Sequence, residues 1–138
     1  MDQVIAKIKK KGNSEIWIRL NTYNGKDRID VREYYKSSDN PEFFPTRKGV
    51  SVTVENLSSI KELFFNLQTA TTIGTYGYLD LFQGFQIQAN QKEYNNHLYN
   101  ELRVYYQDSE TNEWKPTIKG VTFNPALTEQ IVEAIDII

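Results

Sequence analysis

The chain has 138 residues, of which 39% are hydrophobic, 25% are charged and 18 are aromatic (nine Tyr, seven Phe and two Trp). This composition is typical of a soluble globular protein with one ordinary domain or two small ones. The lack of cysteine excludes disulfides and thiolate metal sites, and the single histidine, His97, excludes a histidine cluster. We therefore expect a protein without a metal, without a cofactor and without enzymatic activity.

The net charge is −2, but the charges are distributed unevenly. Residues 1–72 carry 12 Lys and Arg against 9 Asp and Glu (+3), whereas the remainder carries 4 against 9 (−5). A polyanion is therefore expected to favour the first half. No apolar run approaches the ~20 residues that cross a bilayer, and Met1 leads into Asp2 and Lys7 rather than into the apolar segment of a signal peptide. We expect a cytoplasmic protein, nucleoid-associated in a bacterial or viral host, with the nucleus as the alternative.

The first predicted element is a strand at Val4 to Ile8, which ends in three consecutive lysines (9–11) and Gly12. Lysine runs at turns are usually solvated. We interpret this one as a solvated turn, with a phosphate contact as the alternative.

The next two strands form a predicted hairpin. Apolar residues alternate at Ile16, Ile18 and Leu20, which indicates a strand with one buried face. Asn24-Gly25 follows, and because both residues tolerate a positive φ, it predicts a type I′ turn. The second strand of the hairpin is expected at 28–35.

A polar loop at 37–41 leads to a strand at 44–54 and then to a helix at 55–68. The helix has apolar residues at spacings of three and four, which predict one buried stripe. These residues are Leu57, Ile60, Phe64 and Leu67. A Thr- and Gly-rich segment at 69–77 is expected to be a linker.

The remainder of the chain repeats this pattern. Sliding the sequence by 71 positions aligns residues 15–67 with 86–138 without a gap, and 15 of the 53 pairs are identical. The identities cluster in two blocks, which indicates a tandem duplication. The second copy is expected to contain an Asn95-Asn96 turn, strands at 102–106 and 118–123, and a helix that starts at Asn124-Pro125 and packs against the first helix. Its initial segment, 78–85, does not hold the register.

Both copies retain a tyrosine beside the hairpin, an arginine followed by two tyrosines, and a Lys-Gly pair. Single-stranded nucleic acids require cations along the phosphates and aromatic rings against unstacked bases. The retained residues are Tyr23, Arg32, Tyr34, Tyr35 and Lys48, with Tyr94, Arg103, Tyr105, Tyr106 and Lys119. The alternative for each tyrosine is packing within a sheet.

Two details of this set are specific to the strands. Strict alternation places Arg32 and Tyr34 on one face and Tyr35 on the other, so either the strand is irregular or Tyr34 belongs to the binding face. We interpret Gly49 and Gly120 as positions of a bulge or of a close backbone approach rather than as ligand contacts.

Residues 29–35 and 44–51, followed by a helix, resemble the core domain of the positive cofactor four family of transcriptional coactivators. The second copy resembles it less closely at 101–106 and 114–121. This resemblance implies an α+β fold, with two repeats of a curved antiparallel β-sheet of about four strands followed by a C-terminal helix. Repeats at 1–68 and 78–138 would pack through their helices as an intrachain pseudo-dimer.

The resemblance further implies non-enzymatic binding of single-stranded or unwound DNA with little sequence preference, in transcription, replication or recombination. The residues expected to bind are Tyr23, Lys26, Arg28, Arg32, Tyr35, Arg47 and Lys48, with Tyr94, Arg103, Tyr106, Lys115 and Lys119. Two departures from the family pattern are Phe44 and Ile118, where a basic residue is usual. Because each copy lacks cations that the other holds, we expect unequal sites, with the first copy the stronger.

Three alternatives stay open. The protein could instead be an adaptor that docks on a polymerase or replication protein with weak or no nucleic-acid binding, as its acidic second copy allows. RNA could replace DNA as the ligand, because stacking does not distinguish the sugars. A nuclease using Asp30 with Glu33, or Glu101 with Asp108, is disfavoured because no carboxylate pair recurs in both copies in a way that makes a site. The pseudo-dimer is expected to be monomeric or to associate further.

Overall fold

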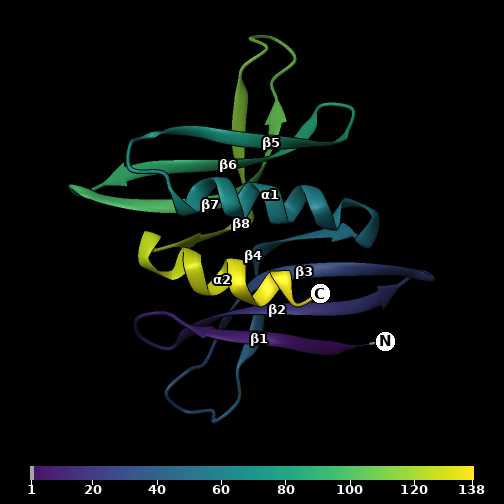
Figure 1. Cartoon of the computed structure of the whole chain (residues 1–138), viewed down its shortest axis with the longest axis vertical. Coiled ribbons are helices and arrows are strands. Elements are labelled where there is room, and N and C mark those ends of the chain that lie inside the picture. Colours follow the sequence, from purple (N-terminus) through teal and green to yellow (C-terminus); the bar gives the residue numbers. More distant parts are fainter. Residues whose placement is uncertain (1) are drawn as a thin grey trace.

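The computed structural model describes residues 2–138 as two four-stranded antiparallel sheets, each followed by a helix (Figure 1). The first repeat contains β1 (Gln3–Lys9), β2 (Ser14–Tyr23), β3 (Lys26–Tyr35), β4 (Phe44–Thr53), the 3-10 helix η1 (Val54–Asn56) and α1 (Leu57–Gln68). The second contains β5 (Gly74–Phe82), β6 (Phe85–Tyr94), β7 (His97–Gln107), β8 (Trp114–Phe123), η2 (Pro125–Leu127) and α2 (Thr128–Asp136). The strands of each sheet follow chain order, so the predicted α+β fold with two equivalent repeats is confirmed.

The hairpin turns adopt the backbone conformation that their residues predict. Asn24 and Gly25 have φ values of 53° and 74°, and Asn95 and Asn96 have values of 51° and 64°. Two successive positive φ angles are the signature of a type I′ turn, whose twist matches that of the flanking strands. Both predicted hairpins are confirmed.

The start of the second repeat differs from its expected course. β5 begins at Gly74, within the segment expected to be a linker, and pairs with β6 along its length. Its register shifts twice, between Thr75 and Gly77 and between Asp80 and Phe82. Each irregularity interrupts the alternation of inward and outward side chains. For this reason, the β5 segment is hard to recognise in the sequence as a copy of β1.

Each helix packs against the sheet of the other repeat. α1 lies against β5 and β6, α2 contacts β1, and the two helices pack on each other between the sheets (Figure 1). Asn66 on α1 donates a hydrogen bond of 2.8 Å to the carbonyl of Tyr76 on β5. The expected helix-to-helix pseudo-dimer is thus confirmed, and the exchange of helices between sheets is an additional finding.

The exchanged helices and the inner faces of both sheets form one core. Phe64 of α1 is fully buried, and its ring centroid lies 6.1 Å from that of Phe123 on β8. The end of the chain packs on α1, because Lys61 donates to the carbonyl of Ile138 at 3.0 Å. Burial of each large apolar side chain stabilises such a core by about 1.5–3 kcal/mol. Among the described residues, no helix is long and apolar enough to cross a membrane.

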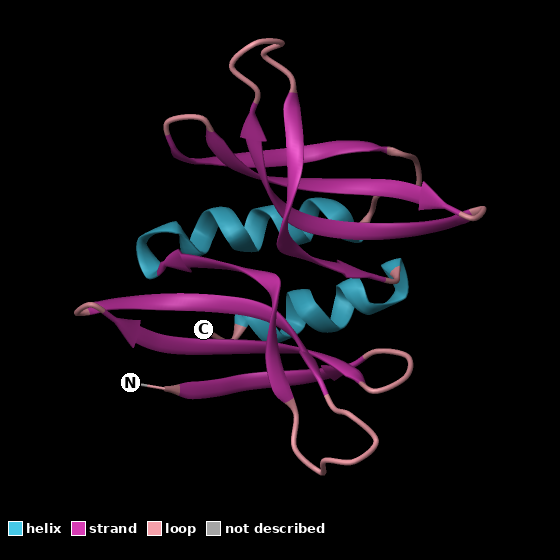
Figure 2. Cartoon of the chain, turned by 180° about the vertical axis from the view of Figure 1, so that it is seen from behind, coloured by secondary structure: helices cyan, strands magenta, loops and turns pink. Residues whose placement is uncertain are grey.

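The alternation of each strand turns the other set of side chains away from the helices. On β2, Ile16 and Ile18 are fully buried against the core, while Trp17 and Arg19 lie on the opposite side. Figure 2 shows the molecule from behind, where the curved strands cross. We call the side of each sheet that points away from the helices its outer face.

Candidate nucleic-acid interface

A bulge in β4 shapes the outer face of the first sheet. Arg32 pairs with Gly49 and Tyr34 with Pro45, so β4 has two more residues than β3 in this interval. Thr46 stabilises the bulge, because its hydroxyl donates to the carbonyl of Glu33 at 2.8 Å. The second sheet has the same irregularity between Arg103 and Tyr105. The duplicated Pro-Thr sequence therefore encodes a bulge at the start of the last strand.

Arg32 lies flat across this bulge. Its Nη2 and Nε donate to the two carboxylate oxygens of Asp30 at 2.9 and 3.2 Å, and its Nη1 donates to the carbonyl of Thr46 at 2.8 Å. A Cβ atom at Gly49 would lie 2.8–2.9 Å from three Arg32 carbons. The interpretation of Gly49 as a close approach is confirmed: only glycine leaves room for the guanidinium.

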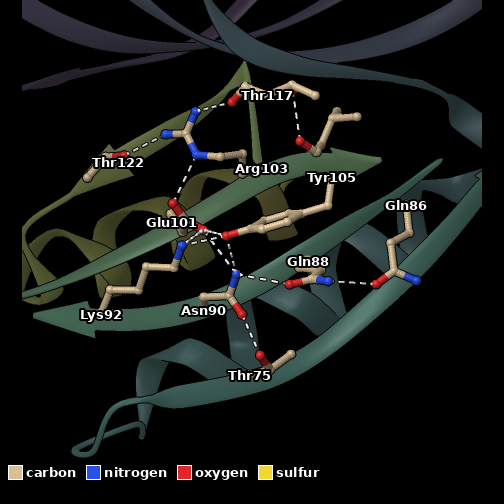
Figure 3. Close-up of polar contacts among 11 residues, drawn as sticks. Thr75, Gln86, Gln88, Asn90, Lys92, Glu101, Arg103, Tyr105, Thr117 and Thr122 are labelled. Atoms are coloured by element: carbon tan, nitrogen blue, oxygen red, sulfur yellow. Dashed lines mark hydrogen bonds and ion pairs between the residues drawn. The ribbon is translucent and has the colours of Figure 1, made fainter. Parts of the chain in front are cut away.

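The second sheet repeats this arrangement with a larger polar network (Figure 3). Arg103 donates to Glu101, to the carbonyl of Thr117 and to the hydroxyl of Thr122, each at 2.9 Å. A Cβ atom at Gly120 would lie 2.8 Å from Arg103 carbons and from a backbone carbonyl. The retained Arg and Gly thus form a structural pair in both repeats. Because both guanidinium groups are already engaged, direct phosphate contact by Arg32 and Arg103 stays a prediction.

The bulges project other cations into solvent. Arg47 and Lys48 are exposed, and among the described residues the Lys48 ammonium forms one long ion pair of 3.7 Å, with Glu33. The equivalent positions of the second sheet hold Ile118, which is 50% exposed, and Lys119. The first bulge therefore offers two cations and the second offers one.

The paired tyrosines have opposite environments. Tyr34 is buried on the outer face of the first sheet and its hydroxyl accepts a hydrogen bond of 2.7 Å from Arg19. This bond raises the pKa of Arg19. Tyr35 is 49% exposed, and Tyr106 is 39% exposed. Tyr34 therefore shares the outer face with Arg32, whereas the solvent-accessible ring belongs to Tyr35.

Trp17 was not among the predicted site residues, although it lies at the centre of the first outer face. Its ring stacks on Tyr34 with centroids 3.9 Å apart, and the ammonium of Lys7 lies 4.2 Å from its centroid. Strand alternation placed Trp17 opposite the buried isoleucines, which was the available signal. Both ring faces are already covered, so this cluster braces the sheet more than it offers a stacking platform.

On the outer face of the second sheet, Gln88 takes the place of Trp17, and Tyr105, the equivalent of Tyr34, belongs to a hydrogen-bonded network (Figure 3). Glu101, 3% exposed, accepts bonds from Tyr105 at 2.6 Å, Asn90 at 3.0 Å and Arg103, and lies 3.3 Å from Lys92. Burial by itself would raise the pKa of Glu101, but the hydrogen bonds from Tyr105, Asn90 and Arg103 hold it below the ordinary value. Burial and the neighbouring carboxylate raise the pKa of Tyr105.

Two predicted contact residues are already bonded to neighbours. Lys115 donates to Asp108 at 2.9 Å, and this bond, with backbone donors, lowers the pKa of Asp108 to about 2. Arg28 donates to the hydroxyl and the carbonyl of Ser51 at 3.0 and 2.9 Å. A phosphate would have to compete with these partners, so the contribution of both residues stays a prediction.

The hairpin tips carry the most exposed predicted rings. Tyr23 is 61% exposed beside the exposed Lys26, and Tyr94 is 70% exposed. Tyr35 lies at the far end of β3 from Lys26, about 30 Å along a strand that rises ~3.3 Å per residue. The predicted residues thus form an extended track rather than one compact pocket.

A cleft of about 1520 Å³ separates the two repeats on one side of the molecule. It lies between the lysine run at the β1–β2 turn and the β6–β7 hairpin with Tyr94, Leu98 and Tyr99. Lys92 and Arg103 line it too. Within residues 2–138, no three His, Asp or Glu side chains gather as a metal site.

Comparisons with known proteins identify similar chains. The family model described as Transcriptional Coactivator p15 (PC4) matches residues 10–63 and 83–134. A putative RNA polymerase II transcriptional coactivator from Caenorhabditis elegans is 32% identical over 44 residues, which are 32% of this chain and 36% of that protein. The similarity therefore spans only about a third of the curated relative.

Two crystal forms of a PC4 homologue from Burkholderia pseudomallei are similar to part of the chain. The tetragonal form has 30% sequence identity and a TM-score of 0.40, and the match covers 44% of this chain and 87% of the homologue. The orthorhombic form has 33% identity and a TM-score of 0.39, with 42% and 77% covered.

Proposed function

The chain belongs to the family of the transcriptional coactivator p15 (PC4), and from this membership we propose that it binds single-stranded or unwound DNA without enzymatic activity. The family supports a role related to transcription. Within this proposal, the bound strand becomes single-stranded during transcription, replication or recombination. The protein then acts at the nucleoid in a bacterial or viral host, or in the nucleus.

One observation carries the proposal: the duplicated Tyr23 and Tyr94 lie on exposed hairpin tips, and the duplicated Lys48 and Lys119 lie on exposed bulges. Tyr23 and Tyr94 are 61% and 70% exposed, and the Lys48 side chain is 59% exposed. A base stacked on an aromatic ring contributes about 1–3 kcal/mol. Bases in a duplex are already stacked on each other, so such rings favour unpaired strands.

The binding experiment compares a labelled oligothymidine with a duplex of equal length by fluorescence anisotropy on the full chain. We expect the single strand to bind more tightly, with an affinity that decreases with salt at a slope of about −0.7 per neutralised phosphate. Equal binding of both forms, or binding of neither, contradicts the proposal. An oligouridine of the same length tests RNA as the preferred ligand.

A pair of variants connects this binding to the rings. Tyr23→Ala combined with Tyr94→Ala should weaken single-strand binding, because two exposed stacking surfaces are lost. Phe65→Ala is the matched control, since Phe65 is 60% exposed but lies on α1. Equal affinities of the double variant and the control would refute a role of the tyrosines.

A second candidate is an adaptor for the transcription or replication machinery. The charge balance of −5 after residue 72 favours it, as do the ion pairs that engage Lys92 and Lys115. A partner captured equally well with and without nuclease treatment, and equally by the double tyrosine variant, would favour this function over DNA binding.

A further inference from the structure

The cleft between the repeats combines residues that are remote in the sequence. The β1–β2 turn of the first repeat and the β6–β7 hairpin of the second lie on the same side of the molecule (Figure 1). Lys10 fixes the turn there, because its ammonium donates to the carbonyl of Thr122 on β8 and to Glu33, both at 2.7 Å. Lys10 thus connects its own sheet to the second repeat and holds the lysine run at the boundary between them.

The cleft is positively charged although the second repeat is acidic. Five cationic residues line it, with one carboxylate. The cations are Lys9, Lys10, Lys11, Lys92 and Arg103. The carboxylate is Glu101, which is 3% exposed and already held by several donors. Across the part of the chain that the structure describes, the exposed ammonium groups of Lys9 and Lys11 form no hydrogen bond or ion pair, so both are available for phosphates.

The opposite wall and the floor suit the faces of unpaired bases. Tyr94 is 70% exposed and Tyr99 is half-buried, while Phe123 and Leu127 form apolar floor. The volume of about 1520 Å³ exceeds the ~300–1,000 Å³ of a typical small-molecule pocket. A cationic rim, two tyrosine rings and a volume larger than that of a small-molecule pocket together fit a flexible polyanion with aromatic bases.

The equivalent place on the other side of the molecule has different chemistry. The β5–β6 turn and the β2–β3 hairpin occupy it in both views (Figures 1 and 2). The turn sequence at 80–84 contains Asp80 and Phe82 but no lysine. The cations that the first repeat contributes through its turn are therefore concentrated on one side only.

We infer that a single DNA strand passes through this cleft and across the boundary between the repeats. Its phosphates lie against Lys9 and Lys11 of the first repeat, and its bases stack on Tyr94 and Tyr99 of the second. This inference rests on the proposed function and specifies its path. It makes the lysine turn a part of the second repeat's site.

Two double variants with the same change in net charge test the path. Lys9→Ala with Lys11→Ala removes the free cleft cations, and Lys26→Ala with Arg47→Ala removes two exposed cations of the first sheet outside the cleft. For oligothymidine we expect the cleft variant to lose about tenfold more affinity than the comparison variant. Its salt slope should become less steep by about 1.4, since two phosphate contacts of ~0.7 each are lost.

Cross-linking locates the bases independently of charge. An oligothymidine containing 5-iodouracil should form adducts at Tyr94 or Tyr99 in the full chain, and Tyr94→Ala should weaken binding about 5- to 150-fold. Equal losses in the two double variants, or adducts confined to Tyr23 and Tyr35, would overturn the path while leaving single-strand binding intact. Absence of any binding by the unmodified chain would instead refute the proposed function.

Discussion

Replacement of Arg32 by alanine separates a structural role of this residue from a role in ligand binding. Asp30 is 5% exposed, and Arg32 is the cation that bonds both of its carboxylate oxygens. Arg32→Ala leaves this carboxylate buried without an ion pair among the described residues, with Arg19 on the neighbouring strand as a nearby cation. If Arg32 served only to contact phosphate, the free energy of unfolding would barely change.

The expected loss follows from the geometry of the pair. Removal of one partner of a buried ion pair costs about 3–5 kcal/mol. The bond from Arg32 to the carbonyl of Thr46 adds about 1 kcal/mol. Against a total stability of about 5–15 kcal/mol for a domain, such a loss is large but need not unfold the protein.

A second variant checks the physical reason. Asp30→Asn combined with Arg32→Ala removes the buried charge together with its partner and keeps the net charge of −2. We expect it to recover much of the lost stability. Because the net charge is unchanged, any loss of DNA binding in this double variant reflects the site and not the overall charge.

Urea unfolding followed by tryptophan fluorescence measures the effect. Trp17 lies beside Arg32 on the neighbouring strand and stacks on Tyr34, so its emission reports on this sheet. With a urea dependence of about 1–3 kcal/mol per molar, a loss of 3 kcal/mol moves the midpoint by about 1–3 M. An unfolding free energy of Arg32→Ala within about 0.5 kcal/mol of the unmodified chain would refute the reasoning.

Three further outcomes are expected. Gly120→Ala should cost about 1–3 kcal/mol in urea unfolding, because its Cβ would lie 2.8 Å from Arg103 carbons and a carbonyl, whereas Gly74→Ala, whose nearest neighbour lies at 3.7 Å, should be nearly neutral. Because the pKa of Glu101 is lowered, its carboxylate stabilises the folded protein above the ordinary pKa of 4.5, and this stabilisation is lost as the pH falls through the lower folded value. In urea unfolding, Glu101→Gln should therefore be less stable than the unmodified chain at pH 7. Its stability should also depend less on pH below 4.5. Phe64→Ala should lower the free energy of unfolding by about 3–5 kcal/mol, because a buried ring is lost. Since this ring packs against Phe123 of the other repeat, hydrogen exchange should show both sheets losing stability together. Separate opening of the two sheets would contradict a shared core.

Local patterns predicted the elements because their signals are short-range. The alternation around Ile16 and Ile18 and the apolar stripe at Ile60 and Phe64 each reflect a fixed strand or helix period. The Asn24-Gly25 turn follows from the backbone freedom of two residues. β5 was the exception, because its two register shifts interrupt the period on which the prediction depends.

The candidate site was predicted in composition but not in arrangement. Arg32 and Gly49 were both identified, yet only the bulge shows that one lies across the other. Tyr34 and Tyr35 were grouped by sequence, although one is buried and the other is exposed. Trp17 was not among the predicted site residues because its position in the second copy is Gln88, so the duplication that highlighted the other residues did not highlight it.

The sequence by itself determined that the chain is a duplicated sheet-and-helix unit with cations concentrated in its first half. Only the tertiary structure decided that the helices exchange between sheets and that the lysine turn lies at the boundary with the other repeat. The contact from Lys10 to Thr122 joins residues 112 positions apart. Such a contact depends on how two folded units dock, and neither the period of a strand nor the residues of a turn contain that information.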